Sequence, residues 1–166
     1  MAVQTTYSVY HDAKYAGAVN SVNPYATASK LNSDAATIPF GLGVVSDGED
    51  KMLLPTNTST AGQFIGVVMR ELNRAYADGE AFGAPVGQDA TVVTHGRVAG
   101  VAGGTVAKDD SVFVVIGDGT TPNAALGKFT NAAGAGALTA VQVSGAKFLE
   151  AGVDGDAVWI SLGLGG

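Results

Sequence analysis

The stretch VTHGRVAGVAGGTVAKDDSVFVV, residues 93–115, decides the fold class. Small and apolar residues alternate in it, with Val98 and Gly100 on one side and Arg97 on the other, which is the period of two that a β-strand has. The turn residues AGG and KDD then separate this run from the second apolar run, SVFVV. We therefore interpret the stretch as strands joined by turns. In this interpretation His95 and Arg97 are edge or interface residues rather than catalysts.

The same pattern of apolar runs and turn residues continues on both sides of this stretch. Short apolar runs alternate with Asp-Gly, Ser-Asp-Gly and Gly-Gly turn signals. The runs lie at residues 38–45, 51–54, 63–69, 90–95, 111–116, 126–130, 138–143 and 156–164. Because longer helical patterns do not separate them, they predict an all-β fold, a jelly-roll-like sandwich or barrel of short antiparallel strands. The best helix candidate is one short segment, residues 69–79.

The closing run DAVWISLGL, residues 156–164, alternates most clearly. One face carries Val158, Ile160, Leu162 and Leu164. This is the pattern of a strand with one buried face. Trp159 stands among small residues on the opposite face. Either it covers a second layer of the same domain, or it is an exposed anchor at a subunit contact.

Residues 1–36 differ from the rest, so we expect an N-terminal arm or lead-in there and a β domain over residues 37–166. Neither helical nor alternating periodicity is sustained in the lead-in. It nevertheless holds four of the five tyrosines, Tyr7, Tyr10, Tyr15 and Tyr25. Either this segment lines the core of the domain, or it is an arm that orders against a partner, because tyrosine supplies a large contact area with a polar tip.

Composition excludes several classes of function. Charged residues make up 14% of the 166 residues, against roughly 25% in an ordinary soluble domain. The net charge is −6 and the basic residues are scattered, so we expect no nucleic-acid partner. The chain has no cysteine, which excludes disulfides and thiolate metal ligands. We also expect no signal peptide and no membrane-spanning helix.

Catalytic motifs are not recognisable in the sequence. GVVSDG, residues 43–48, lacks the spacing of a nucleophile elbow, and GLGVVS, residues 41–46, lacks the third glycine of a dinucleotide fingerprint. Four Asp-rich stretches resemble calcium ligands in composition, but Asp-Gly is also the usual residue pair of β-turns and none has a calcium-loop spacing. We therefore interpret them as turns, and predict a protein without enzymatic activity, cofactor or metal.

The order of these runs resembles the structural cement proteins of tailed bacteriophages. The resemblance covers about residues 38–164 and is carried by IPFGLGVV, GQFIGVVM, THGRVAGVAGGTVAKDDSVFVV, GKFT and AVQVSGAKFLEAGVDGDAVWISLGL. The late segment from Gly145 to Leu149 and the short closing strand are part of it. KDD, residues 108–110, departs from the family pattern, which has a glycine before the acidic residue.

The resemblance implies a structural virion protein, made in the cytoplasm of the bacterial host. Such a protein would bind the exterior of the capsid as a homo-oligomer, a dimer or a trimer, and clamp neighbouring major capsid proteins. The candidate interface residues are Tyr7, Tyr10, Tyr15, Tyr25, Arg97 and Trp159. Two alternatives stay open at this point: a carbohydrate- or receptor-binding β-sandwich, and a hydrolase with an unfamiliar site.

Overall fold

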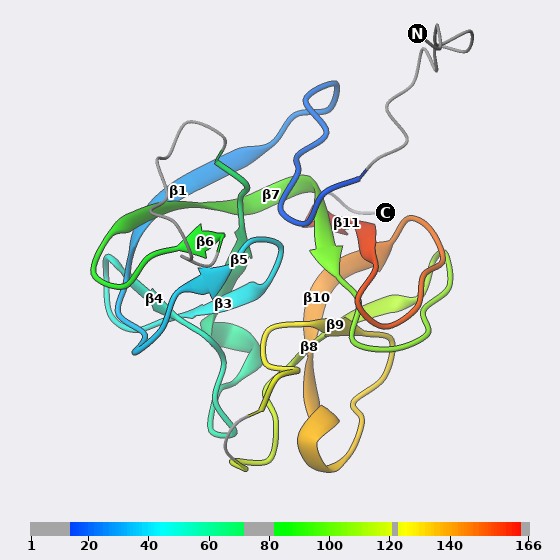
Figure 1. Ribbon diagram of the computed structural model, residues 1–166. Helices are drawn as coiled ribbons and strands as arrows, with labels where there is room; N and C mark the ends of the chain where they lie inside the picture. Colours follow the sequence, from blue (N-terminus) through cyan, green and yellow to red (C-terminus); the bar gives the residue numbers. More distant parts are fainter. Residues whose placement is uncertain (1–13, 72–81, 121–122, 164–166) are drawn as a thin grey trace, which may run out of the picture.

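The computed structural model describes residues 14–71, 82–120 and 123–163, and nearly all of its regular structure is β-strand (Figure 1). The strands are β1 (Ala26–Asn32), β2 (Ile38–Pro39), β3 (Gly43–Ser46), β4 (Lys51–Leu53), β5 (Phe64–Val68), β6 (Gly83–Ala84), β7 (Asp89–Val101), β8 (Ser111–Val115), β9 (Phe129–Thr130), β10 (Ala140–Phe148) and β11 (Ala157–Leu162). The short 3-10 helices are η1 (Ala61–Gln63) and η2 (Gly136–Leu138). The predicted all-β fold, a barrel or sandwich, is confirmed.

Strand pairing closes a first ring. The strands follow in the order β1, β4, β3, β5 and β7, and β7 pairs back to β1. β1 runs parallel to β4, whereas the other paired strands of the described residues are antiparallel. Closing the ring satisfies strand edges that would otherwise expose unpaired backbone groups.

A second set of strands continues from the same β7. It runs in the order β7, β11, β10, β8 and β9, and a bridge between Ala102 and Phe129 leads from β9 back to the end of β7. The two sets use different halves of β7, because β1 pairs with it up to His95 and β11 pairs with it from Gly96 onward. Gly96, with a φ of 109°, stands where β7 changes partner.

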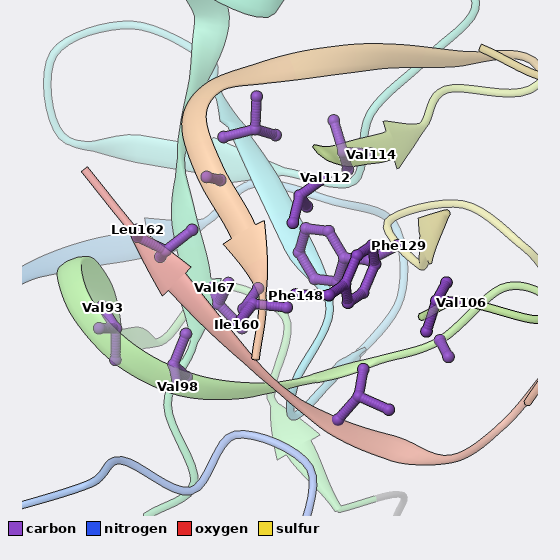
Figure 2. Close-up of a cluster of buried hydrophobic side chains, with 14 residues drawn as sticks. Val67, Val93, Val98, Val106, Val112, Val114, Phe129, Phe148, Ile160 and Leu162 are labelled. Atoms are coloured by element: carbon purple, nitrogen blue, oxygen red, sulfur yellow. The ribbon is translucent and has the colours of Figure 1, made fainter. Parts of the chain in front are cut away.

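Each set of strands has its own apolar core. Val68 and Val92 belong to the cluster of the first ring, while their neighbours Val67 and Val93 belong to the cluster of the second. The second cluster, centred on Phe129, is shown in Figure 2. Successive valines of β5 and β7 therefore point into different cores, since successive side chains of a strand alternate between its faces. This explains why these strands read as continuous apolar runs.

Some strand boundaries differ from those that the sequence predicts. The run 38–45 divides into β2 and β3, and β10 extends to Phe148 with a register shift between Gln142 and Lys147. Gly145 lies inside this shift with a φ of 72°. A bulge of this kind needs glycine just as a turn does, so the sequence alone does not distinguish the two. Of the helix candidate 69–79, residues 69–71 are not helical and the remainder lies outside the described residues.

Residues 14–20 run beside the second half of β7. The Gly17 amide donates to the Ala99 carbonyl at 2.8 Å, and the Ala99 amide donates to the Ala18 carbonyl at 2.8 Å. The amide of Asn20 donates to the carbonyl of Arg97 at 3.0 Å. Within the range 1–36, residues 17–20 and β1 therefore make backbone hydrogen bonds to the β7 of the domain.

Candidate partner-binding surface

The second half of β7 and the neighbouring β11 place two candidate residues, Arg97 and Trp159, on one face of the sheet. Arg97 lies opposite Ser161 of β11, and Ala99 lies opposite Trp159. Directly opposed residues of an antiparallel pair point to the same side of the sheet. Val98 and Ile160, one position further on, are both fully buried in the core. Arg97 and Trp159 therefore share the face of this sheet opposite to Val98 and Ile160, a face on which Ala99 and Ser161 are themselves buried.

Trp159 is half-buried on that face and its backbone is held on both sides. Its amide donates to Glu150 Oε1 at 2.7 Å, and its carbonyl accepts from the Leu149 amide at 2.8 Å. The other carboxylate oxygen of Glu150 forms an ion pair with Lys14. One side chain thus connects the start of the described chain to β11. Both interpretations of Trp159 remain compatible with this position.

Tyr15 lies in the segment that runs beside the second half of β7, and a turn and a cation hold it. The Ala18 amide donates to the Tyr15 carbonyl at 2.9 Å, and Ala18 continues beside Ala99 of β7. The guanidinium of Arg70 lies 4.5 Å from the centre of the Tyr15 ring, a distance at which a cation and an aromatic face attract each other. The ring is nevertheless 55% exposed. It is oriented in advance and still open to contact.

Arg97 and Tyr25 complete the group. Arg97 is exposed, and among the described residues its guanidinium has no hydrogen-bond or ion-pair partner. Tyr25 is 44% exposed, and its Cβ lies against Gly96, where a built Cβ would be only 2.6 Å away. His95, next to this glycine, is exposed and hydrogen-bonded to Thr94.

The backbones of four of the six candidate interface residues, Tyr15, Tyr25, Arg97 and Trp159, therefore lie near residues 96–99 of β7. We call Tyr15, Tyr25, Arg70, Arg97 and Trp159 the aromatic–arginine surface. Tyr7 and Tyr10 lie outside the described residues. Sequence reasoning missed Arg70, Lys14 and Glu150, since no local pattern shows that these residues meet across the fold.

The polar turns of the chain have ordinary structural roles. Gly48, Gly119 and Gly155, the glycines of three Asp-Gly pairs, have φ between 86° and 100°, as the turn interpretation requires. Hydrogen bonds from Thr120 lower the pKa of Asp118, and those from Asn131 and the Ala107 amide lower the pKa of Asp110. In residues 14–71, 82–120 and 123–163, no three His, Asp or Glu side chains gather as metal ligands.

Membrane-spanning helices are absent from the part of the chain that the structure describes. The aromatic–arginine surface combines two tyrosines, a tryptophan and two arginines. Tyrosine, tryptophan and arginine are enriched among the residues that contribute most to protein interfaces.

Comparisons with known proteins identify the family and the fold of the chain. A family model described as structural cement protein (E217 gp24/Pam3 gp6) matches residues 3–163. A chain of the solved structure titled "The capsid of Myoviridae Phage XM1" has the same fold, with a TM-score of 0.72 at 19% sequence identity over 99% of each chain. The search of curated proteins found no match. Since the family match spans nearly the whole chain, the protein belongs to the structural cement protein family of phages and is a capsid-associated structural component of the virion.

Proposed function

We propose that the protein binds the exterior of a phage capsid and clamps neighbouring major capsid proteins, with the aromatic–arginine surface as a principal contact. The observation that carries this proposal is the gathering of Tyr15, Tyr25, Arg97 and Trp159 around a single stretch of β7. Exposed aromatic and arginine side chains are enriched where binding energy concentrates. Residues 1–13, the first part of the N-terminal arm or lead-in that the sequence predicts over residues 1–36, would add further contacts.

Arg97 provides charged hydrogen-bond donors for the proposed contact. Its guanidinium is solvated in the free protein and has no counter-ion among the described residues. A carboxylate or a row of backbone carbonyls on the capsid protein would satisfy its donors, and arginine forms such bonds bidentately. The surface thus favours a partner that presents an acidic or carbonyl-rich ridge.

The available area suits several simultaneous contacts. The chain exposes 9032 Å², whereas one standard interface covers about 800 Å² of each partner. Several capsid subunits can therefore bind one cement protein. A ligand that binds the assembled shell and not its dissociated subunits shifts the equilibrium toward the shell by mass action.

Thermal stability of bare and decorated shells tests the proposal. We expect shells that lack the protein to rupture at a lower temperature, and added protein to restore the higher one. Arg97→Ala together with Trp159→Ala should weaken binding to bare shells by about tenfold or more. Lys108→Ala removes an exposed cation elsewhere and serves as the matched control. Equal melting of bare and decorated shells would refute cementing, and unchanged binding by the double variant would refute this surface.

A further inference from the structure

A short loop leaves the pairing with β7 just before β1 begins. Val19 forms an antiparallel bridge with Val98. Ala26, the first residue of β1, is paired with His95. Seven positions separate Val19 from Ala26, whereas three separate their partners on β7, so four residues have no counterpart there. We call residues 21–24 the valine loop; it projects from the strands as the blue loop at the top of Figure 1.

Both ends of the valine loop are fixed to β7. The Asn20 amide donates to the Arg97 carbonyl at 3.0 Å, and the Cβ of Tyr25 lies against Gly96. Arg97 and Gly96 are neighbours in β7, so the chain would pass directly from one contact to the next if the loop were absent. The pairing is therefore complete without the loop. Extra residues of this kind redirect side chains, and loops held by a rigid scaffold commonly carry function.

The tip of the loop has a fixed shape and presents a valine. The Asn23 amide donates to the Asn20 carbonyl at 3.2 Å, which closes a β-turn, and the Val22 amide donates to Asn20 Oδ1 at 3.1 Å. Pro24, whose ring fixes its φ, follows the turn. Val22 is 91% exposed, so packing within the protein does not explain it. Turns favour glycine, asparagine, aspartate and serine rather than a branched apolar residue.

The surroundings of the loop indicate what covers it. Residues 15–29 are uncharged, although the chain has 9 basic and 15 acidic residues. Tyr25 and Arg97, at the two ends of the loop, belong to the aromatic–arginine surface. A partner that covers this surface therefore meets the valine loop as well. The part of the partner that meets Val22 is apolar, because burying a charge against a valine is costly.

We propose that the valine loop inserts Val22 into an apolar pocket of the major capsid protein, beside the contact of Arg97. This inference rests on the proposed capsid-binding function and specifies the partner surface, which is a small apolar pocket bordered by acidic or carbonyl groups. Single exposed apolar residues are common on proteins. Val22 differs because it stands on an insertion that the pairing does not need. Its turn is also ordered before binding, so docking loses little conformational entropy.

Titration of the full-length protein onto bare shells tests the pocket. Val22→Ala should weaken binding by about tenfold, because two methyl groups no longer leave water. Val22→Thr keeps the shape of the side chain and should also weaken binding by about tenfold, because an apolar pocket leaves the hydroxyl unbonded. Both variants should melt at the wild-type temperature, since Val22 is exposed in the free protein. A threonine variant that binds as tightly as the wild type would overturn the apolar pocket.

Val153→Ala is the matched control. Val153 is 55% exposed in another turn, where its carbonyl accepts from the Asp156 amide. The substitution removes the same two methyl groups and should leave shell binding unchanged. Equal weakening by Val153→Ala and Val22→Ala would show a general effect of surface apolarity and would overturn the assignment to the valine loop.

Deletion of residues 21–24 tests whether the loop is an insertion. The deletion joins Asn20 to Tyr25, should leave the melting temperature nearly unchanged, and should weaken shell binding at least as much as Val22→Ala. Asn20→Ala keeps the valine but removes the bond to its amide, and should weaken binding by about threefold because the turn is less ordered before docking. A deletion variant that melts far below the wild type would refute the insertion, and the Val22 variants then decide the pocket.

This inference and the proposed function fail in different ways. A wild type that does not bind shells refutes the capsid-binding function itself. A wild type that binds, together with Val22→Ala and deletion variants that bind equally well, refutes only the role of the valine loop. In that case Arg97→Ala with Trp159→Ala should still lose binding.

Discussion

At the scale of single residues, Asp109 stands in a backbone conformation that glycine normally occupies. Its φ is 71°, and no other described residue besides glycine has a positive φ. The turn brings the Asp109 amide to the Phe148 carbonyl at 2.8 Å, and Lys147 donates to the Asp109 carbonyl. KDD, residues 108–110, is also where the sequence departs from the glycine of the family pattern.

Asp109→Gly should stabilise the protein. A side chain in the left-handed region destabilises the folded state by about 1–2 kcal/mol, and glycine removes this strain. Glycine also raises the conformational entropy of the unfolded chain, which offsets about 0.5–1 kcal/mol of the stabilisation. We expect a net increase of about 0.5–1 kcal/mol, which is about 1–4 °C in melting temperature for a chain of this size. Asp109→Ala keeps the Cβ and should bring no gain. A lower melting temperature for the glycine variant would contradict this account.

Gly17 is required for a different reason, the close approach of three backbone segments. A Cβ there would lie 2.7 Å from the Arg70 amide nitrogen and from the Val68 carbonyl oxygen, at a φ of 79°. Because rigid backbone surrounds it, Gly17→Ala should cost about 2–4 kcal/mol, the sum of left-handed strain and overpacking. Denaturant unfolding measures this loss. Gly104→Ala, where nothing lies within 4 Å, is the control and should change stability little.

At the scale of elements, apolar periodicity made most of the fold predictable. The alternation in β11 places Val158, Ile160 and Leu162 in the core as expected. β1 could not be predicted in the same way. Its sequence ATASKLN is mostly polar and contributes little to either core, and the strand is held by backbone pairing with β7 and β4. Strands that depend on backbone pairing leave little trace in side-chain patterns.

The candidate site was predictable only through its aromatic residues and Arg97. Tyrosine and tryptophan stand out in a sequence that is poor in both, so their grouping could be anticipated. The ion pair of Lys14 with Glu150 and the contact of Arg70 with Tyr15 join residues far apart in the sequence.

Truncation distinguishes the two interpretations of the lead-in. Deletion of residues 1–13 should leave the melting temperature unchanged and weaken shell binding, if those residues act as the predicted arm. Deletion of residues 1–20 removes the hydrogen bonds to Ala99 and Arg97 and should destabilise the domain itself. Calorimetry and shell binding measure the two effects separately. A shorter deletion that already lowers the melting temperature would assign Tyr7 and Tyr10 to the core.

At the scale of the whole molecule, β5 and β7 join two apolar clusters into one frame (Figure 1). The aromatic–arginine surface borders the second half of β7. The clamping that we propose requires such a frame, since a contact on one side can restrain a capsid subunit only if the rest of the domain does not yield.

The shared strand β7 also determines how the protein loses its structure. Val92 packs into the core of the first ring and Val93 into the core of the second. Melting of either ring would therefore expose one of these valines and would remove the hydrogen bonds along one half of β7. For this reason we expect neither ring to be stable without the other. We therefore expect heating to give a single endotherm whose calorimetric and van't Hoff enthalpies agree, as in an all-or-none transition. Two resolved endotherms would show that the rings melt independently. A subunit that melts all at once has no half-open state in which a decorated shell could begin to leak.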